Sequence, residues 1–183
     1  KAGEWEKAKQ LRLEYADQLS AWRDLQKLNA VAHRDVKPEG GTSLTEGEVT
    51  EVRRLLASSS NLNPGALSAQ DHFLRGTSHY FAGQYEEALA NYNRSLQLRP
   101  DHLYTITNRG QTLLHLGRRR EALADAKRAL ELRPDDPVTL TNRGVALGSL
   151  MRSEEALADF NRAQELSPED PQNLVNLAGA LHI

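Results

Sequence analysis

Apolar residues recur along much of the chain in steps of three and four, the spacing that places them on one face of an α-helix. Within residues 103–136 this pattern predicts two helices, one over about 103–116 and one over about 119–132. Gly117 follows the first helix, as glycine commonly does at a C-terminus, and Pro134 prevents the second helix from continuing. The pattern therefore predicts an all-α chain.

The N-terminal part has a helical pattern of its own. Residues from about Glu4 to Ala32 predict one long amphipathic helix, interrupted by the polar residues Gln18 and Asn29. Such a stripe suits a coiled coil or an arm that packs on its own chain, and the polar breaks favour the second interpretation. A linker is expected at 38–41, where proline and two glycines lie close together.

A short helix is expected between the linker and the repeats described below. It begins after Thr45, where Glu48 completes a capping box, and ends near the serines at 58–60. Ser68 is expected to cap the helix that comes next.

The most specific feature of the chain is a repeat of 34 residues. The block Glu-Ala-Leu-Ala recurs at 87–90, 121–124 and 155–158. Single residues keep the same interval: Gly76, Gly110 and Gly144; Pro100, Pro134 and Pro168; Arg94, Arg128 and Arg162. Small residues such as Gly110 and Ala122 are expected to let the two helices of a unit approach closely.

Glycine at position eight, alanine at position twenty and proline at position thirty-two of each unit resemble the tetratricopeptide repeat family. The resemblance implies a right-handed α-solenoid of helix-turn-helix repeats, preceded here by an N-terminal helical extension. Departures are modest: position four, aromatic in the family, holds His72, Ile106 and Leu140, and Ala178 replaces a fourth glycine. The expected organisation is a helical arm at 1–37, a linker and short helix at 38–68, complete repeats at 69–102, 103–136 and 137–170, and the first helix of a truncated repeat at 171–183.

In this family the first helices line a concave groove, and a position rule applies: residues 2, 5, 9, 12 and 13 of each unit face the groove, together with residue 6. Here that position holds Leu74, Asn108, Asn142 and Asn176. An amide carries both a donor and an acceptor, so three asparagines in register can bond the backbone of an extended peptide whatever its side chains. The alternative is that these amides are solvated or bonded locally.

The rest of the groove wall is mixed in character. We expect the peptide-binding set to include Phe73, Leu74, Tyr80, Tyr104, Thr107, Gln111 and Thr141. Phe73 and Tyr80 are candidate anchors for one ligand side chain; equally, they could pack against the helix near 44–57. The family's clamp for chaperone C-termini uses lysine, asparagine and arginine, and only one of five residues matches: Phe73, Thr77, Asn108, Val138 and Asn142.

Composition narrows the function further. The formal net charge of -2, from 23 basic and 25 acidic side chains, gives no general attraction for nucleic acid. The chain has no cysteine and no His-Glu-x-x-His motif, so we expect neither a metal site nor a cofactor. It has no apolar run long enough to span a bilayer and no secretory leader, so we expect a cytoplasmic protein without membrane contact.

One segment resembles the catalytic loop of Ser/Thr protein kinases: His33-Arg34-Asp35-Val36-Lys37-Pro38-Glu39. In those kinases the residues matching Asp35 and Lys37 act on the substrate hydroxyl and the transferred phosphate. Gly40 stands where the family has a Mg²⁺-binding asparagine, and neither a glycine-rich loop nor an Asp-Phe-Gly motif is present. We therefore expect no catalytic residues and no enzyme activity.

The sequence thus predicts a scaffold or adaptor that binds an extended peptide of a partner protein. The chain starts at Lys1 without methionine and its last repeat is cut short, so we expect an excerpt of a longer protein. One alternative is a recruitment or regulatory segment of a larger signalling enzyme. Another is a structural role with self-association through the N-terminal helix or through the last helix, whose apolar stripe has no partner in this sequence.

Overall fold

The computed structural model describes residues 46–59, 67–169 and 175, and all secondary structure within these ranges is helical. The helices are α2 (Glu46–Ser59), α3 (Ala69–Phe81), α4 (Tyr85–Leu98), α5 (Leu103–His115), α6 (Arg119–Leu132), α7 (Pro137–Gly148) and α8 (Ser153–Leu166). The helices expected at 103–116 and 119–132 are confirmed as α5 and α6, and the short helix expected after Thr45 is confirmed as α2. The all-α fold is also confirmed.

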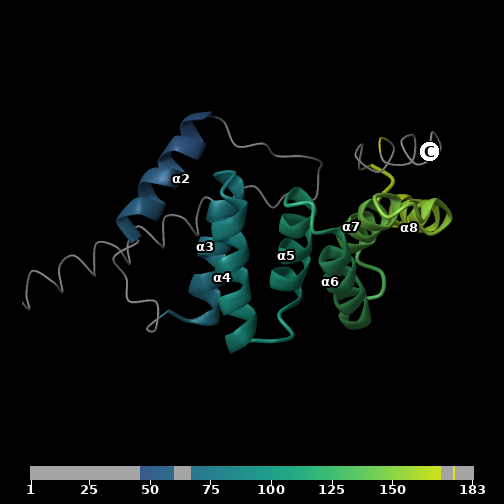
Figure 1. Ribbon diagram of the computed structural model, residues 1–183, viewed down its shortest axis with the longest axis horizontal. Helices are drawn as coiled ribbons and strands as arrows, with labels where there is room; N and C mark the ends of the chain where they lie inside the picture. Colours follow the sequence, from purple (N-terminus) through teal and green to yellow (C-terminus); the bar gives the residue numbers. More distant parts are fainter. Residues whose placement is uncertain (1–45, 60–66, 170–174, 176–183) are drawn as a thin grey trace, which may run out of the picture.

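The helices form consecutive pairs, α3 with α4, α5 with α6 and α7 with α8, and each pair packs against the next (Figure 1). In Figure 1, α8 is turned steeply relative to α4, so the orientation of the pairs changes along the array. Helix α2 packs on α3. The result is an α-solenoid, in which each unit buries its apolar side against its neighbours.

Several sequence-based expectations fall outside the described residues. They are the helix at 4–32, the linker at 38–41, the kinase-like segment at 33–39, the capping box at Thr45 and Glu48, the apolar stripe of the last helix, and Asn176.

Helix α3 begins at a capping box, which confirms the cap expected at Ser68. The Ser68 hydroxyl accepts from the Asp71 backbone N–H at 3.2 Å, and the Asp71 carboxylate accepts from the Ser68 N–H at 2.9 Å. Asp136 caps α7 by accepting from the Thr139 N–H at 2.9 Å, with Pro137 in the first turn, where its missing N–H costs nothing.

The three units close their inter-helix turn differently. Gly83 and Gly117 have φ angles of 74° and 69°, in the left-handed region that glycine adopts without a steric penalty. Met151 stands at the equivalent position of the third unit with φ 62°, and its side chain is 80% exposed. The third turn therefore carries backbone strain that the other two avoid.

We expect Met151→Gly to raise the free energy of unfolding by about 1 kcal/mol, because it removes the left-handed penalty and deletes a side chain with little packing. Urea unfolding followed by circular dichroism would measure the change. Met151→Ala is the control: it keeps the strained φ with a small side chain and should leave stability nearly unchanged. Equal gains from both variants would mean that the methionine side chain, not the backbone, is unfavourable.

Two of the repeated glycines lie directly under aromatic rings. A Cβ added at Gly76 would lie 2.6 Å from the ring of Tyr92, and one added at Gly144 would lie 2.5 Å from the ring of Phe160. At Gly110 the nearest atom, Cβ of Asp125, would be 3.5 Å away, an ordinary contact. A Cβ at Gly110 would also lie 3.7 Å from the backbone oxygen of Ala122, which agrees with the expected close approach of the two helices, although no ring stands opposite this glycine.

In the second and the third unit, an ion pair with a buried carboxylate joins the two helices of the unit. Arg109 of α5 donates twice to Asp125 of α6, at 2.7 and 2.6 Å, and Arg143 of α7 repeats the arrangement with Asp159 of α8. Both carboxylates are only 7% exposed. Bidentate geometry fixes the two helices of a unit relative to each other.

Candidate peptide-binding groove

A pocket of about 520 Å³ lies between α3 and α5, the first helices of adjacent units. Six of the ten predicted binding residues line it: Phe73, Leu74, Tyr80, Tyr104, Asn108 and Gln111. The remaining lining residues are Gln70, Thr77, Phe81 and His102. None is an acid, a lysine or an arginine, so the pocket suits an uncharged ligand side chain with polar groups around it.

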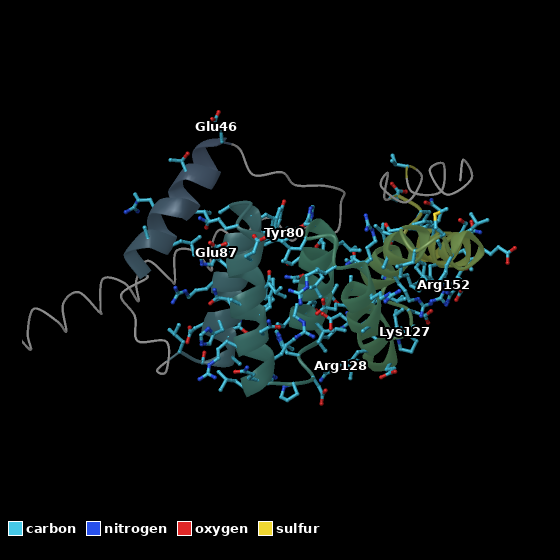
Figure 2. All side chains as sticks on the ribbon, viewed as in Figure 1. Glu46, Tyr80, Glu87, Lys127, Arg128 and Arg152 are labelled. Carbon is cyan, nitrogen blue, oxygen red and sulfur yellow. The ribbon has the colours of Figure 1, made fainter. Side chains whose placement is uncertain are left out.

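One wall of the pocket is aromatic. Phe73 packs edge-on against His102 with ring centroids 5.3 Å apart, and Tyr80 packs edge-on against His115 at 5.4 Å. The Tyr80 hydroxyl also lies 3.0 Å from Nε2 of His115, across the gap between the two units (Figure 2 labels Tyr80). The anchor candidates Phe73 and Tyr80 therefore have ring partners on the side of α5.

Burial keeps both polar groups of this wall uncharged near neutral pH. It raises the pKa of Tyr80 to about 12, with the nearby Tyr85 adding to the shift, so the hydroxyl remains protonated. Burial also lowers the pKa of His102, and the positive charge of Arg99 adds to that effect. The ring of His102 stays neutral, with Nδ1 2.6 Å from the hydroxyl of Thr105.

Tyr104 forms the accessible rim. Its side chain is 57% exposed, its ring centroid lies 6.0 Å from that of His102, and the Arg133 guanidinium lies 5.8 Å above its ring. A large ring that is exposed at the mouth of an apolar pocket can be covered by a ligand at little conformational cost.

The floor of the pocket joins it to the core. Leu74 is only 2% exposed, so it closes the pocket from below and offers a ligand little surface. Beside it the buried Tyr92 hydroxyl donates to Thr77 at 3.2 Å. Burial raises the pKa of Tyr92, and its hydrogen bonds with Thr77 and Asn108 partly offset that rise. Asn108 is therefore shared between the pocket and this internal network, and an amide has further hydrogen-bonding capacity to offer.

The other predicted residues lie away from this pocket. Thr107 is buried, with its hydroxyl 3.1 Å from that of Thr139, so it joins α5 to α7 instead of facing a ligand. Thr141 is half-buried. Asn142 is also half-buried, and its Nδ2 has no hydrogen-bond partner among the described residues.

Four lining residues are absent from the predicted peptide-binding set: Gln70, Thr77, Phe81 and His102. Gln70 is the second residue of its unit, equivalent to Tyr104, so the position rule itself could have found it. His102 precedes α5 at the position that Ser68 and Asp136 hold before α3 and α7. The 34-residue interval would thus have placed it at a helix start, but not in the pocket.

Two other features, a membrane-spanning helix and a metal-binding cluster, are absent from the described part of the chain. No described helix is long and apolar enough to cross a membrane. No group of three or more metal-binding side chains converges among residues 46–59, 67–169 and 175.

The chain matches the models of one protein family. Two family models described as tetratricopeptide repeat match the chain, one at residues 78–139 and one at residues 138–170. Together they span just over half of the chain. A comparison with curated protein sequences gave no match.

Solved structures agree with these family matches. The first TPR of Spaghetti (RPAP3) bound to the HSP90 peptide SRMEEVD is 25% identical, with a TM-score of 0.60, over 63% of this chain and 91% of that one. The Arabidopsis OM64 TPR domain is also 25% identical, with a TM-score of 0.60, over 63% and 96%. MamA AMB-1 shares the fold at 19% identity and a TM-score of 0.66, over 91% and 88%. The chain therefore belongs to the tetratricopeptide repeat family, whose helical solenoids act as protein-interaction scaffolds.

Proposed function

We propose that this chain binds an extended segment of a partner protein along the groove formed by α3, α5 and α7. One apolar side chain of that segment enters the pocket between α3 and α5, and the amides of Asn108, Asn142 and Asn176 bond its backbone. The chain acts by non-covalent binding and catalyses no reaction. We place this activity in the cytoplasm, as expected from the sequence.

The observation that carries the proposal is the composition of the pocket. Its volume of about 520 Å³ exceeds what a single side chain needs, and its aromatic wall faces amides on α5. An apolar side chain inserted there loses its contact with water, while Asn108 and Gln111 remain beside the ligand backbone. This combination of an anchor pocket and side-chain amides fits a peptide better than a small polar metabolite.

The neighbour RPAP3 supports peptide binding as the mode and not the same ligand. Its structure holds the HSP90 peptide SRMEEVD, which has three acidic residues among its last four. In this chain, Phe73, Thr77 and Val138 occupy three positions of the family's carboxylate clamp, and none of them carries a positive charge. We therefore expect an internal, apolar-anchored segment as the ligand instead of a chaperone C-terminus.

A peptide-display selection on the whole 183-residue chain would supply ligands, and Tyr104→Ala is the decisive variant. We expect it to weaken the selected peptides about tenfold or more, since exposed aromatic residues at a pocket mouth carry much of a binding energy. Val138→Ala is the matched control, because Val138 holds the equivalent position one unit later and is 53% exposed, but lies outside the pocket. Equal losses in both variants, or no loss in either, would contradict the pocket.

The amide contribution needs a separate variant. Asn108→Ala combined with Asn142→Ala should also weaken binding about tenfold if both amides contact the ligand, with helicity unchanged. Binding unaffected by this pair, but lost with Tyr104→Ala, would retain the pocket and reject the asparagine ladder.

A further inference from the structure

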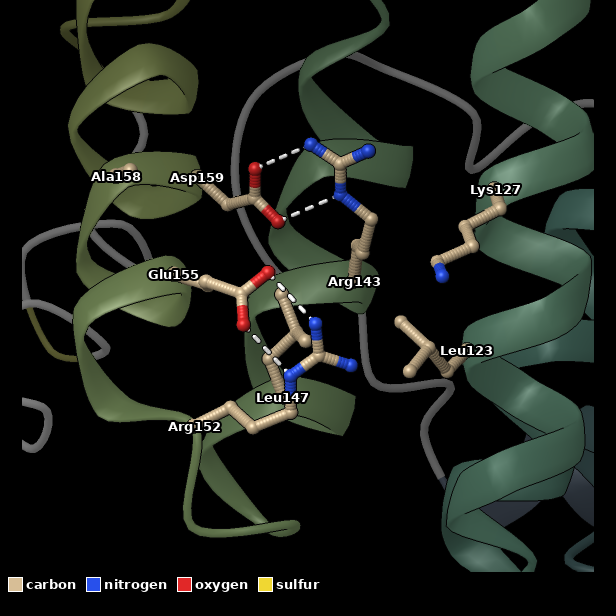
Figure 3. A pocket seen from close by; sticks show the side chains of 8 residues that line it. All are labelled: Leu123, Lys127, Arg143, Leu147, Arg152, Glu155, Ala158 and Asp159. Atoms are coloured by element: carbon tan, nitrogen blue, oxygen red, sulfur yellow. Dashed lines mark hydrogen bonds and ion pairs between the residues drawn. The ribbon is translucent and has the colours of Figure 1, made fainter.

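A second pocket lies between α6, α7 and α8 and shares no lining residue with the pocket between α3 and α5. Its volume is about 270 Å³, and it is lined by Leu123, Lys127, Arg143, Leu147, Arg152, Glu155, Ala158 and Asp159 (Figure 3). The lining combines an apolar floor of two leucines and an alanine with five charged side chains. Its chemistry therefore differs from that of the uncharged groove.

Each of the two arginines in this pocket uses two of its three guanidinium nitrogens in hydrogen bonds within the protein. Arg143 donates through Nε and one terminal nitrogen to Asp159, at 2.7 and 2.6 Å, and Arg152 donates in the same way to Glu155, at 2.6 and 2.7 Å. In Figure 3 the third nitrogen of each guanidinium points into the pocket, and the Lys127 ammonium reaches toward Arg143 from the opposite side. Within the described part of the chain, none of these three groups has an acceptor.

In the preceding unit, all three guanidinium nitrogens of the equivalent arginine have acceptors within the protein. There Arg109 holds Asp125 with two nitrogens, and its third nitrogen donates to Oδ1 of Asn93 at 2.8 Å. Asn93 and Lys127 are equivalent, 34 residues apart. Replacing the acceptor asparagine by lysine thus turns a closed hydrogen-bond network into a pocket with two cations facing each other.

We propose that this pocket binds an acidic side chain, glutamate or aspartate, from a second segment of a partner protein. The carboxylate would accept hydrogen bonds from the third nitrogen of Arg143 and from Lys127, taking the place that the Asn93 oxygen holds in the preceding unit. Leu123 and Leu147 are 8% and 3% exposed, so they close the floor of the pocket and offer the ligand little surface.

The charge of the pocket favours a carboxylate over a phosphate group. Lys127, Arg143 and Arg152 are offset by Glu155 and Asp159, so the pocket carries one net positive charge. The hydrogen bond from Arg152 lowers the pKa of Glu155, which therefore stays ionised at neutral pH. A monoanionic carboxylate neutralises this site, whereas a phosphate dianion would leave the pocket with one net negative charge.

The test compares three peptides that differ at one residue: acetyl-Leu-Glu-Leu-amide, its glutamine analogue and its phosphoserine analogue. Each is titrated into the ¹⁵N-labelled 183-residue chain, with chemical shifts followed at residues 127 and 143. We expect the glutamate peptide to bind about tenfold more tightly than the glutamine peptide, because charge-assisted hydrogen bonds are the stronger ones. Equal affinity for both would overturn the proposal.

Exchange of the two equivalent residues provides matched variants. Lys127→Asn restores the internal acceptor and should abolish the preference for glutamate without unfolding the chain. Asn93→Lys should create a second glutamate-dependent site, with shifts around residue 109. Retention of the preference in Lys127→Asn would overturn the proposal. So would tighter binding of the phosphoserine peptide, or shifts at residues 127 and 143 that depend on protein concentration alone, which would make the occupant a second copy.

Discussion

Gly144→Ala is expected to lower the free energy of unfolding by about 2 kcal/mol, the typical cost of overpacking minus the gain in helix propensity. The added Cβ would lie 2.5, 2.8 and 2.9 Å from three atoms of the Phe160 ring. That ring is 4% exposed and held within the core shared by the second and third units, so it cannot move aside easily. Urea unfolding followed by circular dichroism would measure the loss.

The repeat supplies the control for this variant. Gly110→Ala makes the same chemical change at the equivalent position, where the added Cβ would meet only ordinary contacts at 3.5 and 3.7 Å. The position that holds Phe160 in the third unit holds Ala126 in the second. Gly110→Ala should therefore leave stability unchanged or raise it by up to about 1 kcal/mol. Destabilisation of both variants by the same amount would mean that the ring contact is unimportant.

Helix positions could be predicted from the sequence because they depend on local signals that recur. Gly117, Pro134 and Ser68 each act within a few residues of the backbone they terminate or cap. At the 34-residue interval the proline recurs in all three units, the glycine in two, and a side-chain cap in two. The role of each repeated glycine could not be predicted in the same way. It depends on whether a ring or an alanine stands on the partner helix, and that pairing is set by packing.

For the candidate site, too, the sequence predicts which helix face is involved but not which side chains bond to one another. The position rule placed Phe73, Tyr80 and Tyr104 correctly around one pocket, because the side of a helix that faces the neighbouring unit follows from periodicity. It did not show that Thr107 bonds Thr139, or that Asn108 contributes to the buried network of Tyr92. Such hydrogen bonds depend on side-chain geometry between helices, which a sequence pattern does not contain.

Both binding proposals rest on differences between equivalent positions. The position of Tyr104 holds Val138 one unit later, and the position of Lys127 holds Asn93 one unit earlier. In each pair, only Tyr104 or Lys127 lines a pocket that we propose as a binding site. A repeat protein can therefore change its ligands at single positions while the backbone pairs stay the same.

Asp159→Asn is expected to lower the free energy of unfolding by about 2 kcal/mol. Removing one partner of a buried ion pair costs more than this, but Arg143 keeps 30% of its side chain exposed, so solvent screens part of the loss. The variant leaves a guanidinium against a neutral amide that can accept only one of its two short hydrogen bonds. Urea unfolding of the 183-residue chain would measure it, and a loss below about 0.5 kcal/mol would show that the pair is not important for stability.

The first unit lacks this ion pair at the equivalent positions. Asn91 stands where Asp125 and Asp159 stand, and its Oδ1 lies 3.4 Å from Nδ1 of His72. Arg75 is the equivalent of Arg143, and its Nε is buried without a hydrogen-bond partner among the described residues. Burial of the guanidinium lowers the pKa of Arg75, since it disfavours the charged form. Asn91→Asp should therefore raise the free energy of unfolding by about 1 kcal/mol, the opposite sign from Asp159→Asn. If both substitutions destabilise the chain, the ion pair is specific to the packing of its own unit, and repeat equivalence does not extend to it.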